Sequence, residues 1–156
     1  MTPDIDIKKE NREAVVEHLN NVVADLHMLY AKTRNFHWNV TGMAFHSLHE
    51  LFEVQYDQIK LQEDAVAERV RMLGGLAIGT LQEYIDRSRL SETPGEYPKA
   101  TEMVKQLLTD HETIIGYLRD AIDSADEHND EGSADLLTAE IQMHEEMAWM
   151  LRATIE

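Results

Sequence analysis

Residues 48–75, LHELFEVQYDQIKLQEDAVAERVRMLGG, decide the fold class because their apolar and polar side chains each return at helical spacing. Apolar side chains recur from Leu48 to Leu73 at intervals of three, four or seven residues, as expected for the buried stripe of one long helix. Gly74-Gly75 then supplies the stop signal that is typical of a helix C-terminus. The stretch therefore predicts a long amphipathic helix with a defined end.

Three further segments carry apolar side chains at the same spacing. They cover residues 15–38, 103–122 and 137–155. Abundant Leu, Ala, Glu, Met and Gln, with only 7 Gly and 3 Pro, agree with an all-helical chain. Four long helices in one small chain predict an all-α four-helix bundle.

The joints between these segments differ in length and composition. Residues 39–42 form a short turn, which predicts that the first two helices are antiparallel neighbours. Residues 75–98 are too long for a simple hairpin. Within them Thr80-Leu81-Gln82-Glu83 has the form of a capping box, so we expect a short extra helix near residues 80–87, in the crossover between helices two and three. The third joint, residues 124–133, is acidic.

Composition excludes several classes of protein. The 156 residues suit a single domain over residues 1–156, with a short N-terminal tail over about residues 1–8. The formal charge of −16 argues against a nucleic-acid binder that works through its general field, and suits a protein that attracts cations. The absence of Cys excludes disulfides and thiolate zinc sites. Because no stretch approaches the roughly 20 apolar residues of a membrane span and the start is polar, we expect no membrane partner and a cytoplasmic location.

A polar stripe runs beside the apolar stripe of the second helix. Its members follow one another every three or four residues: His49, Glu53, Tyr56, Lys60, Asp64 and Glu68. Such a stripe is commonly a solvated face. However, His49 with Glu53, and Asp64 with Glu68, each lie one turn apart and can present two ligand atoms to one cation. Carboxylate and imidazole together suit iron, manganese or zinc.

The two pairs cannot share one ion within one chain, because the 15 residues from His49 to Asp64 span about 22 Å of helix. Two copies of the helix packed antiparallel about a two-fold axis remove this difficulty. Facing residues then have numbers of constant sum, and both His49 with Glu68 and Glu53 with Asp64 add to 117. The axis falls near residues 58–59, giving two equivalent sites per dimer. The pattern predicts an intersubunit metal site, although a coincidence stays open in so acidic a chain.

An iron pair inside one bundle is the alternative kind of site. It requires a Glu-x-x-His motif on each of two helices. None of the eight histidines has Glu three residues before it. We therefore do not expect an intrachain di-iron oxygenase.

Residues along the first two helices resemble the Dps family, the mini-ferritins named for protecting DNA in starved cells. The resemblance rests on His37-Trp38-Asn39-Val40-Thr41-Gly42, Phe45, Leu48-His49-Glu50, Tyr56, Asp64, Ala67-Glu68-Arg69 and Leu73-Gly74-Gly75. It implies a ferritin-like four-helix bundle that assembles from two-fold dimers into a hollow homo-oligomeric shell of twelve subunits. It also implies that the shell oxidises Fe(II), preferably with hydrogen peroxide, and stores the ferric product inside.

The resemblance also implies roles for single residues. One subunit would supply His37, His49 and Glu53 to a ferroxidase site that holds up to two irons. The two-fold partner would supply two carboxylates, those of Asp64 and Glu68. Trp38, next to His37, is expected to act as an electron sink. Many family members have Asp where this chain has Glu53, which leaves open whether Glu53 binds iron directly or through a water.

Other carboxylates are candidates for handling iron elsewhere on the shell. Glu50 and Asp57 are candidates for mineral nucleation, with solvated surface as the alternative. An acidic three-fold pore for iron uptake could be lined by Asp130, Asp135 and Glu140. Ordinary charge at a helix N-terminus is the alternative for the first two.

Two other function classes stay under consideration. Direct DNA binding is not expected, because the N-terminal tail offers only Lys8, Lys9 and Arg12 among acidic residues. A purely structural acidic bundle would be a monomer or small oligomer, and His49→Ala would then leave iron chemistry unchanged.

Overall fold

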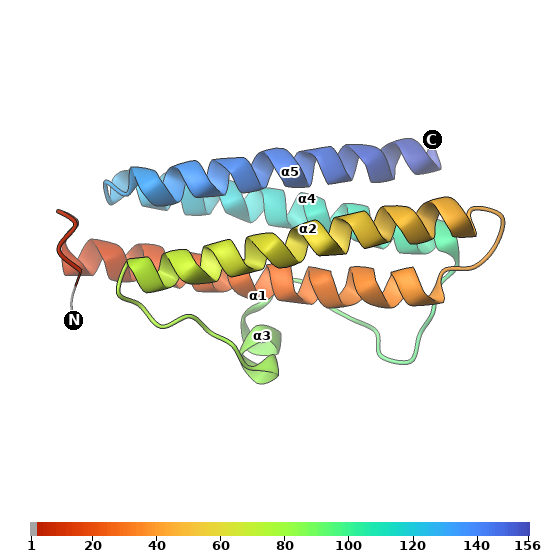
Figure 1. The fold of residues 1–156 in the computed structure, drawn as a ribbon, viewed down its shortest axis with the longest axis horizontal. Helices are drawn as coiled ribbons and strands as arrows, with labels where there is room; N and C mark the ends of the chain where they lie inside the picture. Colours follow the sequence, from red (N-terminus) through yellow and green to blue (C-terminus); the bar gives the residue numbers. More distant parts are fainter. Residues whose placement is uncertain (1–2) are drawn as a thin grey trace.

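The computed structural model describes residues 3–156, which form a bundle of four long helices and one short helix, with no strand in this range (Figure 1). Residues 1 and 2, part of the predicted N-terminal tail, lie outside the described residues. The helices are α1 (Lys9–Asn39), α2 (Phe45–Met72), α3 (Leu81–Arg87), α4 (Ala100–Glu127) and α5 (Glu131–Ile155). This arrangement confirms the predicted all-α fold with an extra helix in the crossover.

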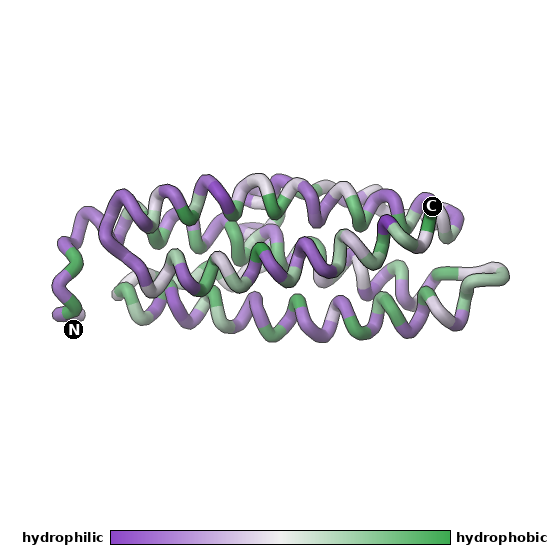
Figure 2. The backbone as a smooth tube through the Cα atoms, turned by 90° about the horizontal axis from the view of Figure 1, so that it is seen from above, coloured by the Kyte–Doolittle hydropathy of each residue, from purple (hydrophilic) through white to green (hydrophobic). Residues whose placement is uncertain are grey.

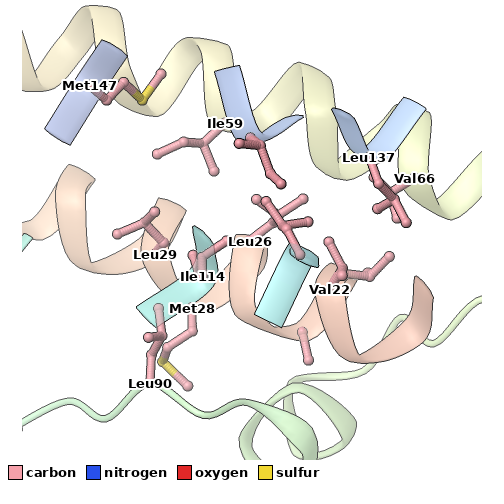
Figure 3. Close-up of a cluster of buried hydrophobic side chains, with 14 of the residues drawn as sticks. Val22, Leu26, Met28, Leu29, Ile59, Val66, Leu90, Ile114, Leu137 and Met147 are labelled. Carbon is pink, nitrogen blue, oxygen red and sulfur yellow. The ribbon is translucent and has the colours of Figure 1, made fainter. Parts of the chain in front are cut away.

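The four long helices share one apolar core. Along each of them apolar and polar residues alternate at helical spacing (Figure 2). In the close-up of Figure 3, all four helices contribute to the buried cluster: Leu26 of α1, Ile59 of α2, Ile114 of α4 and Leu137 of α5 are each at most 1% exposed, and Leu137 lies beside Val66. Burying a side chain of this size stabilises the fold by about 1.5–3 kcal/mol.

The turn between α1 and α2 is short and requires a glycine. Gly42 has φ +104, a left-handed conformation that costs glycine little, and the Phe45 N–H donates to its carbonyl at 3.0 Å. The two helices therefore run back along each other as antiparallel neighbours. This turn brings the last residues of α1 beside the first residues of α2.

The predicted stop at the end of α2 is confirmed. Gly74 has φ +85, and the Gly75 N–H donates to the Val70 carbonyl at 3.0 Å, which closes the last turn. A Cβ atom on Gly75 would lie 2.7 Å from Val16 of α1, so this position also permits close packing of the chain against α1.

The short helix α3 begins with the predicted capping box. The Glu83 N–H donates to Thr80 Oγ1 at 3.3 Å, and the Thr80 N–H donates to Glu83 Oε2 at 3.0 Å. Helix α3 packs against α1, on the side of the bundle away from α5 in Figure 1. The crossover thus places α4 and α5 beside the first hairpin.

The third joint is much shorter than the acidic stretch 124–133 predicted from the sequence. Helix α4 continues to Glu127 and α5 begins at Glu131. Asn129 takes a left-handed conformation with φ 57, which Asn tolerates better than most residues, and Asp130 caps α5. Acidic residues that suggested a loop therefore lie in helix ends. No helix of the described residues is long and apolar enough to cross a membrane.

Candidate metal centre

Two histidines meet where α1 ends and α2 begins. The His37 and His49 rings are stacked with centroids 3.8 Å apart, and His37 is buried. His37 Nδ1 donates to the carbonyl of His49 at 2.7 Å, and His49 Nδ1 donates to the carbonyl of His37 at 2.9 Å. Because a carbonyl can only accept, each Nδ1 carries hydrogen and each neutral ring keeps a lone pair on Nε2. This reciprocal bonding fixes the tautomer and leaves both Nε2 atoms as potential metal ligands.

Aromatic rings enclose the histidine pair. Tyr56 meets His37 edge-on with ring centroids 5.3 Å apart, and Phe45 lies 5.1 Å from the His49 ring. Tyr30 packs edge-on against Tyr56 at 6.0 Å. These rings pack around the two imidazoles and hold them in place.

The role of Tyr30 was missed by reasoning from the sequence. Tyr30 lies seven residues before His37, and Tyr56 lies seven residues after His49, so each tyrosine is two turns from its histidine on the same face. Burial raises the pKa of Tyr56, and the neighbouring carboxylates of Glu53 and Asp57 raise it further. The hydroxyl of Tyr56 is therefore protonated at neutral pH and can donate a hydrogen bond.

The predicted carboxylate ligands lie on the exposed face of α2. Glu53 is one turn from His49, whereas Asp64 and Glu68 are three turns or more beyond Glu53. None of these three carboxylates makes an ion pair or hydrogen bond with another of residues 3–156. Nor do the described residues contain a group of three or more His, Cys, Asp or Glu placed to hold a metal ion. One chain thus brings together His37 and His49 with Glu53 near, and leaves the second carboxylate pair apart.

Trp38 occupies a different environment from its neighbour in sequence. Its side chain is 63% exposed, and the guanidinium carbon of Arg34 lies 5.0 Å from its ring. Arg34 also stacks on Tyr30 at 4.7 Å. A cation over an indole attracts the negative face of the ring. Trp38 therefore lies on the surface of the bundle, linked through Arg34 to the aromatic rings beside the histidines.

The two carboxylates predicted for mineral nucleation are both exposed. Glu50 lies 3.5 Å from His46 Nε2 in a surface pair, one helical turn apart. Asp57 makes no ion pair with any other of the described residues. Nucleation stays a prediction for both.

Asp130, predicted to line a pore, is a buried helix cap within the single chain. This side chain is 1% exposed and caps α5, accepting the Ser133 N–H at 3.0 Å and the Ser133 hydroxyl at 2.6 Å. Arg69 of α2 completes its environment with an ion pair. A carboxylate used in this way has no oxygen facing solvent, so the alternative of helix capping accounts for Asp130.

Glu140, also predicted to line a pore, is 3% exposed and lies on the buried side of α5. Burial raises its pKa to about 7, and Oε2 has no hydrogen-bond partner among the described residues. A pore shared by several subunits must be lined by surface side chains. Of the three predicted pore residues, only Asp135 is exposed.

A second pair of histidines, which no motif had singled out, lies between α4 and α5. His111 and His144 are both fully buried, and their Nδ1 atoms are 2.8 Å apart. Burial lowers the pKa of His144 to about 3 and that of His111 well below its usual value. Both residues fall on the apolar stripes of their helices, and that position could have identified them as buried. The described residues place no group of three or more His, Cys, Asp or Glu around this pair.

Comparison with known proteins agrees with this geometry. A family model described as a ferritin-like domain matches residues 16–156. An uncharacterised low temperature-induced protein of Nostoc sp. is 46% identical over 154 residues, covering 98% of this chain and 86% of the relative. A DNA protection during starvation protein of Brevibacillus brevis is 39% identical over 150 residues, covering 96% of this chain and all of the relative.

Solved structures give the same result. The Dps protein of Bacillus brevis superposes with a TM-score of 0.91 at 39% identity, covering 96% of this chain and 100% of that chain. The Dps protein of Vibrio cholerae, described as a member of a broad superfamily of ferritin-like diiron-carboxylate proteins, superposes with a TM-score of 0.94 at 27% identity, covering 99% of this chain and 97% of that one. The fold, the histidine pair and these relatives together show that the chain belongs to the Dps family of ferritin-like proteins.

Proposed function

We propose that this protein oxidises Fe(II), preferably with hydrogen peroxide, at sites shared by two subunits, and stores the ferric product in a hollow cytoplasmic shell of twelve subunits. The observation that carries the proposal is the reciprocal bonding of His37 and His49, which leaves an Nε2 lone pair on each of two stacked rings. This reaction removes both Fe(II) and hydrogen peroxide, and it would thereby protect the cell and its DNA from oxidative damage. The names of the relatives, DNA protection during starvation protein among them, support that role.

The partner subunit completes the site in this proposal. Asp64 and Glu68 lie on the same face of α2 as His49 and Glu53 and have no partner within residues 3–156. A surface pocket of about 460 Å³ beside Asp64 gives room for side chains of another molecule. Two imidazoles and three carboxylates suit iron and leave coordination positions open for the oxidant. The side chain of Glu53 is one carbon longer than that of Asp, and it would bind the iron either directly or through a water.

The chemistry requires two electrons for each peroxide. Two Fe(II) ions give up one electron each, and hydrogen peroxide with two protons becomes two waters, so no hydroxyl radical is released. Trp38 is the proposed sink for an electron that escapes this pairing. The formal charge of −16 per chain concentrates Fe(II) near the shell. Asp135 is proposed to line the route of uptake, and Glu50 is proposed to nucleate mineral.

Direct DNA binding has no part in the proposal. Arg12, one of the few basic residues near the N-terminus, is buried and donates from Nε to the Leu73 carbonyl at 3.1 Å. Lys9 lies 3.5 Å from Glu13 in a surface pair. The tail thus has little free positive charge to offset the acidic surface. Retention of DNA in a gel shift at low salt, without added divalent cation, would contradict this.

The proposal is tested by measuring soluble iron retained per chain after Fe(II) and peroxide are added without oxygen. The wild type is compared with His49→Ala and with the matched control His46→Ala, an exposed histidine one turn away. We expect the wild type and the control to retain far more iron than a single site holds, and His49→Ala to oxidise iron slowly. Equal precipitation of iron with all three proteins would identify the chain as a structural bundle.

A further inference from the structure

We propose that Lys60 of one subunit pairs with Asp57 of its two-fold partner, and that these two symmetric ion pairs set the register in which the shared metal site assembles. This inference rests on the proposed function, since it uses the same antiparallel pairing of α2. It assigns Asp57 to the seam between subunits instead of the mineral-facing surface.

The first observation is the charge pattern of α2. Lys60 is the only Lys or Arg between Phe45 and Glu68, a segment with six acidic residues. Two such surfaces brought together without a cation would repel each other. Lys60 and Asp57 are both exposed, and neither makes an ion pair or hydrogen bond within residues 3–156 although they are three residues apart. Both charges are therefore free to meet a partner.

The second observation is that the register of the ligand pairs also matches these charges. In that register the numbers of facing residues add to 117, and so do 57 and 60. Asp57 of each subunit then lies at the same height along the paired helices as Lys60 of the other. The two ion pairs fall on either side of the axis, between the two metal sites.

Apolar side chains follow the same arithmetic. Phe45 and Met72, 44% and 57% exposed, add to 117 and would lie at the two ends of the seam. Leu61, 71% exposed, adds to 117 with the half-buried Tyr56. One register thus places these two apolar pairs together, a base opposite an acid, and ligands opposite ligands. Such agreement is the complementarity expected of an interface between identical chains.

A slide of one helical turn destroys the match. With facing numbers that add to 121, Asp57 would oppose Asp64, and both are acidic. With a sum of 113, Lys60 would oppose Glu53 and neutralise a proposed ligand. Like charges therefore disfavour the slide to 121, whereas the slide to 113 keeps an ion pair but uses a proposed ligand to form it. The pairing of Lys60 with Asp57 provides opposite charges in the register that leaves every ligand free, which makes both residues positioning residues.

The test uses Lys60→Asp and Asp57→Lys, each alone and then mixed. Each variant alone opposes like charges at two places across the axis, so we expect association at least about tenfold weaker than in the wild type. Mixing the two variants restores opposite charges at both places in the mixed dimer. Native mass spectrometry and light scattering should show the assembly recover on mixing, together with the rate of iron oxidation.

Mixing separates this pairing from one within a single chain. An Asp57–Lys60 contact inside one helix would stay broken in both variants, so mixing would rescue nothing. The matched controls are Lys105→Asp and Asp123→Lys on α4, which are exposed and change the charge by the same amounts. We expect these controls to assemble as the wild type does.

The outcomes separate this inference from the proposed function. Single variants that assemble normally, or variants that fail to recover on mixing, overturn the register pair while leaving iron oxidation by the wild type untouched. Recovery on mixing in a protein that does not oxidise iron would support the pair and refute the proposed function. Assembly is measured without iron, so neither result depends on the other.

Discussion

His111 and His144 share a hydrogen bond between their Nδ1 atoms, 2.8 Å apart, inside a core where both rings are fully buried. One ring must donate and the other accept, so one neutral pair satisfies this bond and protonation of both rings breaks it. Neither Nε2 has a hydrogen-bond partner among the described residues. This arrangement makes the bundle sensitive to acid.

The sign of this sensitivity follows from the lowered pKa values. Below pH 6.5 the unfolded chain takes up protons on both histidines and the folded chain does not, so the free energy of unfolding falls as the pH drops toward the folded pKa of His144, about 3. Because of the histidine pair, the free energy of unfolding should fall by up to about 4 kcal/mol between pH 6.5 and pH 5. Urea titrations should show a flatter pH dependence for His111→Leu/His144→Leu than for the wild type. The exposed control His46→Gln should keep the wild-type slope, and an equally steep slope in the double variant would contradict the assignment.

Glu140→Gln should stabilise the protein at alkaline pH. The folded pKa of about 7 lies above the unfolded value of 4.5, so the contribution of the protonated carboxyl is fully present below pH 4.5 and is lost as the pH rises through 7. The amide is never ionised, and we expect a gain of about 1–3 kcal/mol at pH 8 and little at pH 4.5. Chemical denaturation at both pH values measures the difference, with Glu146→Gln, at an exposed position of the same helix, as control. A loss of stability at pH 8 would mean that the Glu140 carboxylate meets a cation in the assembly.

Asp130→Ala should destabilise the protein by about 2–4 kcal/mol. The change removes the cap of α5 and leaves the guanidinium of Arg69 without its partner. Thermal unfolding checks this, and the exposed Asp135→Ala in the first turns of the same helix should change stability by less than about 0.5 kcal/mol. If Asp130→Ala and Asp135→Ala changed the stability by nearly the same amount, Asp130 would not be a buried cap.

Trp38→Phe should raise the yield of hydroxyl radical during iron oxidation while leaving the initial rate of Fe(II) loss unchanged. The indole is exposed and lies outside the aromatic rings around the histidines, so the ligands stay in place when it is replaced. Spin trapping measures the radical, with Trp149→Phe, another exposed tryptophan, as control. An unchanged radical yield would remove Trp38 as an electron sink.

Local signals in the sequence predicted much of this fold. The Gly74-Gly75 stop and the Thr80 capping box depend on residues within a few positions of each other, and both appear in the structure. The burial of Asp130 and Glu140 was not foreseen, because both were proposed as pore residues from their residue type alone. Glu140 lies three residues after Leu137 and seven before Met147, both buried, so its spacing marked it as inward-facing.

The candidate centre shows a different limit. The spacing of His49, Glu53, Asp64 and Glu68 predicted which residues belong together, but the reciprocal bonds of His37 and His49 depend on how one short turn sets two helix ends side by side. Tyr30 is recognisable only once that turn is formed. Helix periodicity predicts faces, whereas contacts across a turn need its three-dimensional geometry.

The turn at Gly42 has a consequence for the order of events in the cell. His37 and His49 are only 12 residues apart, so their half of the centre forms as soon as one hairpin closes. In the proposed shell the carboxylate half arrives only when a second subunit docks. A newly made chain would therefore hold the histidines ready without being able to turn over iron, and oxidation would begin only where a container for the product already exists.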